Sequence, residues 1–279
     1  VLDVRLQSSY TLRNYYGKGI VQTNTYQDTS FPYHVAGLDG TGQIVGVADS
    51  GLDDKHCFFV ESDGSTTPRS SIYSPSYDNS RRKVTQYISY GNSVDEVDGH
   101  GTHVCGTIAG IDTSGVTPTQ QGHAPGAKIA FMDVESGSSF SIPYPLGHWM
   151  FRIAQDAGAK LHSNSWGASI NYYVPEAADV DKYHYDNEDF LALFAAANDG
   201  SYGYYSVGFP AVCKNVLTVG ATRTASNMGS MAYFSSMGPT FDGRIKPDIS
   251  APGYPTTSAY GNLTDSDNCA VGQMSGTSM

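Results

Sequence analysis

The chain has 279 residues, and its 27 acidic and 16 basic side chains give a formal net charge of −11. A surface this acidic argues against nucleic acid or an anionic membrane as a partner. No apolar run approaches the ~20 residues that a membrane span needs. The length suits one large domain or two small ones.

The first part of the chain contains one clear strand signal. Residues 1–40 are polar and aromatic and are punctuated by glycine and proline, which predicts an extended segment packed on a domain. The run from Gly42 to Gly51 is short and apolar and carries Asp49 near its end, which is typical of a buried parallel strand. Residues 61–83 are rich in serine, proline and arginine, and we interpret them as a surface insertion.

A histidine motif follows this insertion. Gly99-His100-Gly101-Thr102-His103 leads into an apolar run over 104–111 at helical spacing, so His100 is expected at the start of a buried helix. The glycine on each side of His100 lets another backbone or a substrate approach closely. A histidine fixed in this way can accept and donate a proton near neutral pH. His103 and His100 have the spacing of metal ligands, but no third ligand is apparent, so we expect a structural hydrogen bond from His103.

The remaining chain alternates apolar strands with helices. Strands are expected at 129–134, 160–165, 190–197 and 216–221, with shorter candidates at 233–236 and 248–250. Helices are expected at 145–157, where Gly158 follows as a stop, and at 174–187. This alternation predicts an α/β fold with a doubly wound, mostly parallel sheet that has helices on both faces. Functional groups of such sheets gather at the carboxyl ends of the strands, where Asp49, Ser165 and Asn198 are expected to lie.

The four cysteines allow three disulfide pairings. None of them forms a CxxC motif, which argues against a structural zinc site. Cys105 lies in the apolar helix after His100 and is expected to be a free, buried thiol. Cys213 and Cys269 lie in polar, loop-like surroundings, and they are the pair we favour for a disulfide, with Cys57 left over.

The last residues give the histidine a partner. The chain ends with Gly276-Thr277-Ser278-Met279, and a serine among small residues is by itself most often a turn residue. The chain order Asp49, His100, Ser278 changes this interpretation, because it is the order of the catalytic residues in subtilisin. The motifs at 47–51, 99–104, 164–167, 196–200, 234–253 and 276–279 resemble those of subtilisin-like serine proteases. The longer secreted members, of the bacterial alkaline and protist types, are the most similar, and the resemblance extends from about residue 42 to residue 279.

The resemblance implies a role for individual residues. Ser278 would be the nucleophile, His100 the general base and then acid, and Asp49 the carboxylate that orients the imidazole. Asn198 would donate its side-chain amide to the oxyanion, together with the backbone N–H of Ser278. The walls of the substrate pocket would be formed by Ser165, Trp166 and Gly167 on one side and by Ala196 and Ala197 on the other.

Three features depart from the family pattern. Ala197 stands where the family usually has a glycine, so its methyl group is expected to narrow the pocket slightly. The calcium loop of many compact subtilisins is not recognisable between residues 112 and 126, so no motif supports a calcium site. We expect that the enzyme requires no cofactor. The sequence stops one residue after Ser278. Residues 41–279 are therefore expected to form an incomplete catalytic domain, whose core a further C-terminal segment or a second chain completes.

Two functions fit these features. The favoured one is a serine endopeptidase that cleaves polypeptides through an acyl-enzyme, in an extracellular or secretory-pathway compartment, and the sequon Asn262-Leu263-Thr264 agrees with this location. The alternative is a non-catalytic scaffold or assembly component with the subtilase fold. A scaffold has no chemical need of the triad and Asn198 together, which favours the enzyme. The pocket beside Trp166 shows no evident charge in the sequence, so apolar or medium-sized side chains are expected at the cleaved position.

Overall fold

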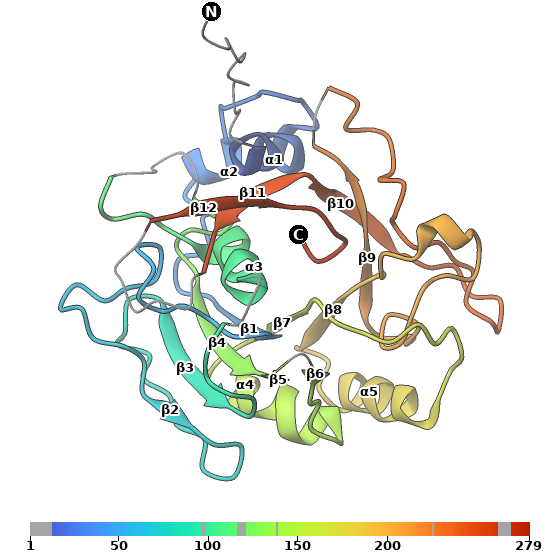
Figure 1. The fold of residues 1–279 in the computed structure, drawn as a ribbon, viewed down its shortest axis with the longest axis horizontal. Coiled ribbons are helices and arrows are strands. Elements are labelled where there is room, and N and C mark those ends of the chain that lie inside the picture. Colours follow the sequence, from blue (N-terminus) through green and yellow to red (C-terminus); the bar gives the residue numbers. More distant parts are fainter. Residues whose placement is uncertain (1–12, 96–98, 116–120, 138, 225, 262–268) are drawn as a thin grey trace, which may run out of the picture.

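The computed structural model describes residues 13–95, 99–115, 121–137, 139–224, 226–261 and 269–279. Its centre is an eight-stranded sheet in the order β10-β9-β8-β7-β1-β4-β3-β2, and every strand pair in it is parallel (Figure 1). The strands are β1 (Ile44–Asp49), β2 (Arg69–Ser70), β3 (Val84–Ser89), β4 (Lys128–Asp133), β7 (Leu161–Asn164), β8 (Leu191–Ala195), β9 (Leu217–Arg223) and β10 (Ile249–Tyr254). The predicted parallel α/β sheet is confirmed.

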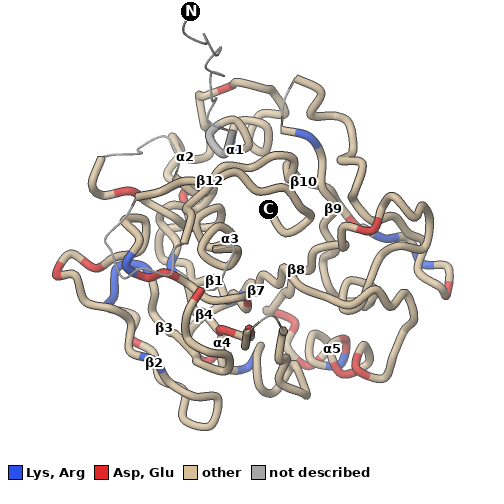
Figure 2. Tube along the Cα trace, viewed as in Figure 1, with Lys and Arg blue, Asp and Glu red and all other residues tan. Residues whose placement is uncertain are grey.

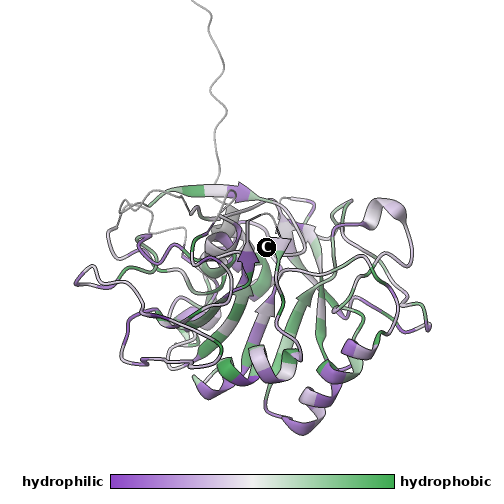
Figure 3. Cartoon of the chain, turned by 60° about the horizontal axis from the view of Figure 1, so that its bottom comes forward, coloured by the Kyte–Doolittle hydropathy of each residue, from purple (hydrophilic) through white to green (hydrophobic). Residues whose placement is uncertain are grey.

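Helices cover both faces of this sheet. One face packs against α3 (His100–Ala109), and the other packs against α4 (Arg152–Asp156) and α5 (Pro175–Asp186). A π-helical turn, η2 (Gly147–Phe151), leads directly into α4. Neighbouring residues of β1 serve the two sides, because Val47 belongs to the core under α3 and Ala48 to the core under α4 and α5. Charged residues lie mainly on the loops and helices around the sheet (Figure 2), while the strands are mostly hydrophobic (Figure 3).

The order of the strands makes β1 the switch point of the sheet. β2, β3 and β4 lie on one side of β1, and β7, β8, β9 and β10 follow on the other. The connections therefore diverge at β1, and parallel sheets bind their ligands outside the carboxyl end of the strands at such a point. Asp49 is the last residue of β1, so its side chain lies at this position.

Further elements lie outside the large sheet. β11 (Thr256–Ala259) and β12 (Val271–Met274) form an antiparallel hairpin that packs on α3. A smaller hairpin, β5 (Glu135–Ser136) and β6 (Ser139–Phe140), follows β4, and a 3₁₀ turn, η3 (Gly200–Tyr202), follows β8. Near the N-terminus, α1 (Arg13–Thr23) packs against β10 and β11, and α2 (Pro32–Val35) follows it. The expected extended segment therefore contains two helices joined by turns and irregular chain. Packing on the domain stabilises α1 despite its two glycines.

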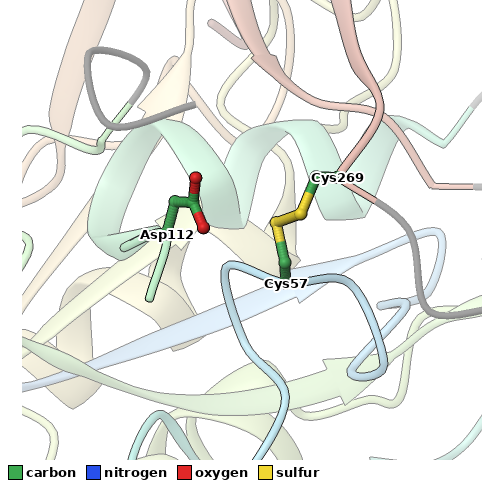
Figure 4. Close-up of side chains that lie close together, drawn as sticks. All are labelled: Cys57, Asp112 and Cys269. Atoms are coloured by element: carbon green, nitrogen blue, oxygen red, sulfur yellow. A yellow bond between two sulfur atoms is a disulfide. The ribbon is translucent and has the colours of Figure 1, made fainter. Parts of the chain in front are cut away.

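Two further sequence expectations are wrong. Residues 233–236 form a turn and an irregular stretch rather than a strand. The disulfide joins Cys57 to Cys269 (Figure 4). Cys213 is free and buried, as is Cys105. The two linked cysteines are 212 residues apart in the chain and meet because the segment just before β12 lies beside the loop between β1 and β2. The same contact includes His56, whose Nε2 donates a hydrogen bond to the carbonyl oxygen of Ala270 at 2.8 Å.

One part of the sheet has an exposed apolar face. The register places Leu161, Leu193, Leu217, Val219 and Ile249 on the same face of β7, β8, β9 and β10. This is the face that α3 covers over β1 and β4, but here Leu161 is 45% exposed and Ile249 is 50% exposed. The opposite face of β8 is buried, with Ala192 and Phe194 in the core. No helix in the described part of the chain is both long enough and apolar enough to cross a membrane.

Candidate active site

The site begins at the first residue of α3, which is His100. Gly99 precedes it in the left-handed conformation, with φ of 62°. A Cβ atom on Gly99 would lie 2.8 Å from the backbone nitrogen of Gly261, and one on Gly101 would overlap the carbonyl oxygen of Gly51. The two glycines therefore allow two other backbone segments to contact the chain beside the imidazole, as the sequence predicted.

Side chains from distant loops satisfy the first backbone N–H groups of α3. The hydroxyl of Ser50 accepts the N–H of Gly101 at 3.0 Å and donates to Asp95 at 2.9 Å, while Asp95 accepts the N–H of Thr102 at 3.0 Å. Asp95 is buried, and this burial raises its pKa to about 6. These bonds fix the start of the helix to the residue that follows Asp49. Sequence reasoning missed Asp95, because a capping residue is sought directly before a helix and Asp95 lies outside that window.

Asp49 and His100 form a direct pair. The imidazole Nδ1 lies 2.6 Å from Oδ1 of Asp49, and the same oxygen accepts the N–H of Ser50 at 2.8 Å. The Asp49 side chain is 1% exposed and that of His100 is 28% exposed. The carboxylate requires a proton on Nδ1, so Nε2 is the ring nitrogen that can accept a proton from a substrate or a nucleophile.

Ser278 lies beside Ser165, the residue that follows β7. Its hydroxyl donates to the carbonyl oxygen of Ser165 at 3.3 Å, and the hydroxyl of Ser165 donates to the carbonyl oxygen of Ser278 at 3.0 Å. Asn198 is fixed from the same segment, because its Oδ1 accepts both the N–H and the hydroxyl of Thr277, at 2.9 and 3.1 Å. The amide Nδ2 of Asn198 therefore keeps its donors for another partner. His100, Asn198 and Ser278 all line one cavity of about 580 Å³.

A second cavity of about 210 Å³ adjoins the first. Ser165, Trp166 and Gly167 line both cavities, and Ala197 lines the second one. Ala196 lines neither cavity, because its side chain is fully buried. The alternation of side chains along the extended chain places Ala195 in the wall instead. The indole of Trp166 also packs edge-on against Phe194, with ring centroids 5.5 Å apart, so it serves both the pocket wall and the core.

Two acidic residues that the sequence reasoning did not assign to the pocket line these cavities. Glu135 lines the first cavity, and Asp199 lines the second and accepts the hydroxyl of Ser169 at 2.7 Å. Neither cavity has a lysine or an arginine among its described lining residues. The expected uncharged pocket is therefore wrong. Asp199 could have been found only from its position directly after Asn198. A turn at the end of a strand brings the next side chain near the same cavity.

A buried aspartate at the end of the switch strand is paired with a histidine that lines a cavity, and a serine and an amide donor line the same cavity. This is the arrangement of a serine hydrolase site. Comparison with known proteins agrees. The sequence profile of the subtilase family, a peptidase family, matches residues 40–279, and the chain belongs to this family.

Individual relatives support the assignment. The chain is 33% identical to the serine protease/ABC transporter B family protein tagB of Dictyostelium discoideum, over 85% of this chain and 16% of that protein. It is 30% identical to subtilisin Savinase of Lederbergia lenta, over 88% of this chain and 74% of that protein. The solved structure of the Clostridium perfringens CspB protease shares the fold, with a TM-score of 0.66 and 16% identity over 88% of this chain and 81% of that one. The chain thus spans about one sixth of the length of tagB.

Proposed function

We propose that the chain is the catalytic domain of a serine endopeptidase, with Ser278 as nucleophile, His100 as base and Asp49 as the orienting carboxylate. The observation that carries this proposal is the 2.6 Å bond between Asp49 and His100 at the cavity that Ser278 and Asn198 also line. A serine hydroxyl is a weak nucleophile until a base removes its proton. The buried carboxylate stabilises the imidazolium that forms in this step.

The reaction runs through an acyl-enzyme. The Ser278 hydroxyl turns from the Ser165 carbonyl to His100, its proton passes to Nε2, and its Oγ bonds to the substrate carbonyl carbon. The oxyanion of the resulting tetrahedral intermediate accepts hydrogen bonds from Nδ2 of Asn198 and the N–H of Ser278. His100 then returns the proton to the leaving amine as the C–N bond breaks, and water hydrolyses the ester by the same steps. No step needs a metal ion or a cofactor.

The substrate class follows from the walls of the second cavity. Trp166 and the small residues around Ala197 suit apolar side chains of medium size, and such surfaces discriminate single methylenes by only about 1–3 kcal/mol. Asp199 and Glu135 add negative charge without a lysine or arginine among the described lining residues. We expect broad specificity, in which lysine and arginine are accepted at the cleaved position and acidic side chains are disfavoured.

The exposed face of β7 to β10 supports a further component. Leu161 on the interior strand β7 and Ile249 on the edge strand β10 are about half exposed there, although the faces of a parallel sheet are normally covered. We infer that an apolar helix, supplied by a polypeptide segment outside these 279 residues, covers this face in the functional protein. Such a helix would complete the core beside Ser278.

We also propose that the protein works in an extracellular or secretory-pathway compartment. The Cys57–Cys269 disulfide supports this location, because disulfides persist in oxidising compartments and are rare in the cytosol. The sequon at Asn262 lies outside the described residues.

A fluorophosphonate probe tests the catalytic proposal, because it labels only a serine whose hydroxyl an adjacent base activates. The complete protein is expected to be labelled once, and peptide mapping is expected to place the label on Ser278. A folded Ser278→Ala variant should take up no label and hydrolyse no peptide. Label on another residue would overturn Ser278 as the nucleophile. No label on folded wild-type protein would favour the alternative of a non-catalytic scaffold.

A further inference from the structure

The residue before Asn198 has a strained backbone. Ala197 has a φ of 90°, a conformation that residues with a side chain rarely adopt. This is the position where the family usually has a glycine, and glycine would adopt the conformation without cost. Strain of this kind persists only where the surrounding structure fixes it, and it is concentrated at functional sites. The question is which contacts keep Ala197, and with it Asn198, in place.

One buried residue binds the backbone on both sides of Asn198. The N–H of Ser236 donates to the carbonyl oxygen of Ala197 at 3.0 Å, and the hydroxyl of Ser236 accepts the N–H of Asp199 at 2.9 Å. Ser236 is fully buried, so water does not compete for these bonds. Asn198 therefore lies between two peptide groups that are both attached to Ser236.

We propose that Ser236 is a positioning residue for the oxyanion donor of this enzyme. It acts through Asn198, whose side chain Thr277 orients and whose backbone Ser236 fixes. An oxyanion donor is effective only when it is already aligned with the position of the developing charge. The strain at Ala197 would otherwise turn the Asn198 backbone away from this alignment. The inference rests on the proposed function, since it assigns a role in the same reaction.

The neighbouring residue offers a matched control. Ser235 is also buried, and its hydroxyl accepts one backbone N–H, that of Ala221 in β9, at 3.0 Å. The Ser235 hydroxyl makes no described hydrogen bond to residues 197–199. Ser236→Ala and Ser235→Ala thus each remove one buried hydroxyl that accepts one backbone N–H, and only the first touches the Asn198 segment.

The test measures both variants in the complete protein. Ser236→Ala is expected to lower kcat about tenfold with KM changed less than twofold, because a displaced donor loses transition-state stabilisation and not ground-state binding. A peptide aldehyde, which forms a tetrahedral adduct at Ser278, should bind about tenfold more weakly, while a non-covalent product peptide should bind equally well. Ser235→Ala should leave all these values within about twofold of wild type. Equal losses in the two variants would overturn the proposal, because they would indicate a merely structural role.

The strained alanine provides a second, independent measurement. Ala197→Gly removes the strain, so in the Ser236→Ala background it is expected to restore a large part of kcat and of aldehyde binding. If the two substitutions are simply additive, Ser236 does not oppose the strain and the proposal fails.

Hydrogen exchange separates this inference from the proposed function. The amide of Asp199 should lose protection in Ser236→Ala and keep it in Ser235→Ala, whether or not the protein is active. Unchanged protection of Asp199 would overturn the role of Ser236, whereas absence of fluorophosphonate labelling in wild type would overturn the catalytic proposal on which it rests.

Discussion

Asp49 and Asp133 stand opposite each other in the register of β1 and β4, and each is the last residue of its strand. Both are fully buried, but their partners differ. Asp49 accepts a hydrogen bond from the imidazole of His100, whereas Asp133 accepts backbone N–H groups of Ser93 and Glu135. Burial raises the pKa of Asp133 to about 7, and the nearby carboxylates of Glu135 and Asp95 add to this effect.

The pKa of Asp133 predicts a pH dependence of stability. The pKa is about 7 in the folded protein, against an ordinary value of 3.8 in the unfolded chain. Between these two pH values the folded protein binds one more proton than the unfolded chain. The contribution of Asp133 to the free energy of unfolding is therefore fully present below about pH 4 and is lost as the pH rises to about 7. The loss is at most about 1.4 kcal/mol per pH unit.

Urea unfolding of wild type and Asp133→Asn between about pH 4.5 and 7.5 measures this contribution. The free energy of unfolding of wild type minus that of the variant should fall as the pH rises. The subtraction cancels the buried histidines, His103 and His162, whose lowered pKa values act in the opposite direction. A difference that does not change with pH would contradict the prediction.

Asn198→Ala should lower kcat by about 10²–10³ with little change in KM, a magnitude established for subtilisin itself and carried over to this family member. The reason is that the amide donor acts on the oxyanion and not on the bound substrate. Steady-state kinetics on a peptide substrate measure the effect, and Asn227→Ala, an exposed turn residue, serves as the control. A fall in kcat of less than about threefold would show that Asn198 is not the donor.

Asp199→Asn should reduce the acceptance of basic side chains. The kcat/KM for a peptide with lysine at the cleaved position, divided by that for the matching norleucine peptide, should fall about twofold to fivefold. This is the size expected for one partly exposed ion pair. The substitution keeps the shape of the side chain, so hydrolysis of the norleucine peptide should be nearly unchanged. If the ratio stays constant, Asp199 does not contact the cleaved side chain.

Ile249→Lys should separate a covered sheet face from an exposed one. If a helix from outside the 279 residues packs on this face, a buried lysine in the complete protein will lower the free energy of unfolding by several kcal/mol. Ile245→Lys is the control, because Ile245 is 87% exposed and a surface substitution changes stability by only about ±0.5 kcal/mol. Equal effects of the two substitutions, measured by thermal unfolding, would show that no segment covers the face.

The sequence predicted those parts of the fold that local pattern determines. β1 and β4 are apolar because both faces of the sheet are covered there, and the glycines beside His100 are needed where two backbones meet. β3 was missed, because Thr85 and Gln86 interrupt its apolar pattern although both are buried.

Contacts between distant segments were not predictable in the same way. Cys57 meets Cys269, Asp95 binds the start of α3, and Ser236 brackets Asn198, each through the tertiary fold and without a local motif. The same holds for Asp199. The resemblance pointed to its neighbour Asn198, but it did not show that the side chain of Asp199 lines the second cavity. Sequence pattern thus predicted the candidate reacting groups, and the structure was needed to find the residues that contact them.

The Cys57–Cys269 disulfide has a consequence for the lifetime of the enzyme. A protease at high concentration digests its own exposed loops, and residues 73–80 form such a loop, with Tyr73 81% exposed. Any cut between residues 57 and 269 leaves the two fragments covalently joined, so the piece that carries Asp49 cannot diffuse away from the piece that carries Ser278. A self-nicked molecule would therefore retain all its reacting groups, and its nicks would become visible only on a reducing gel.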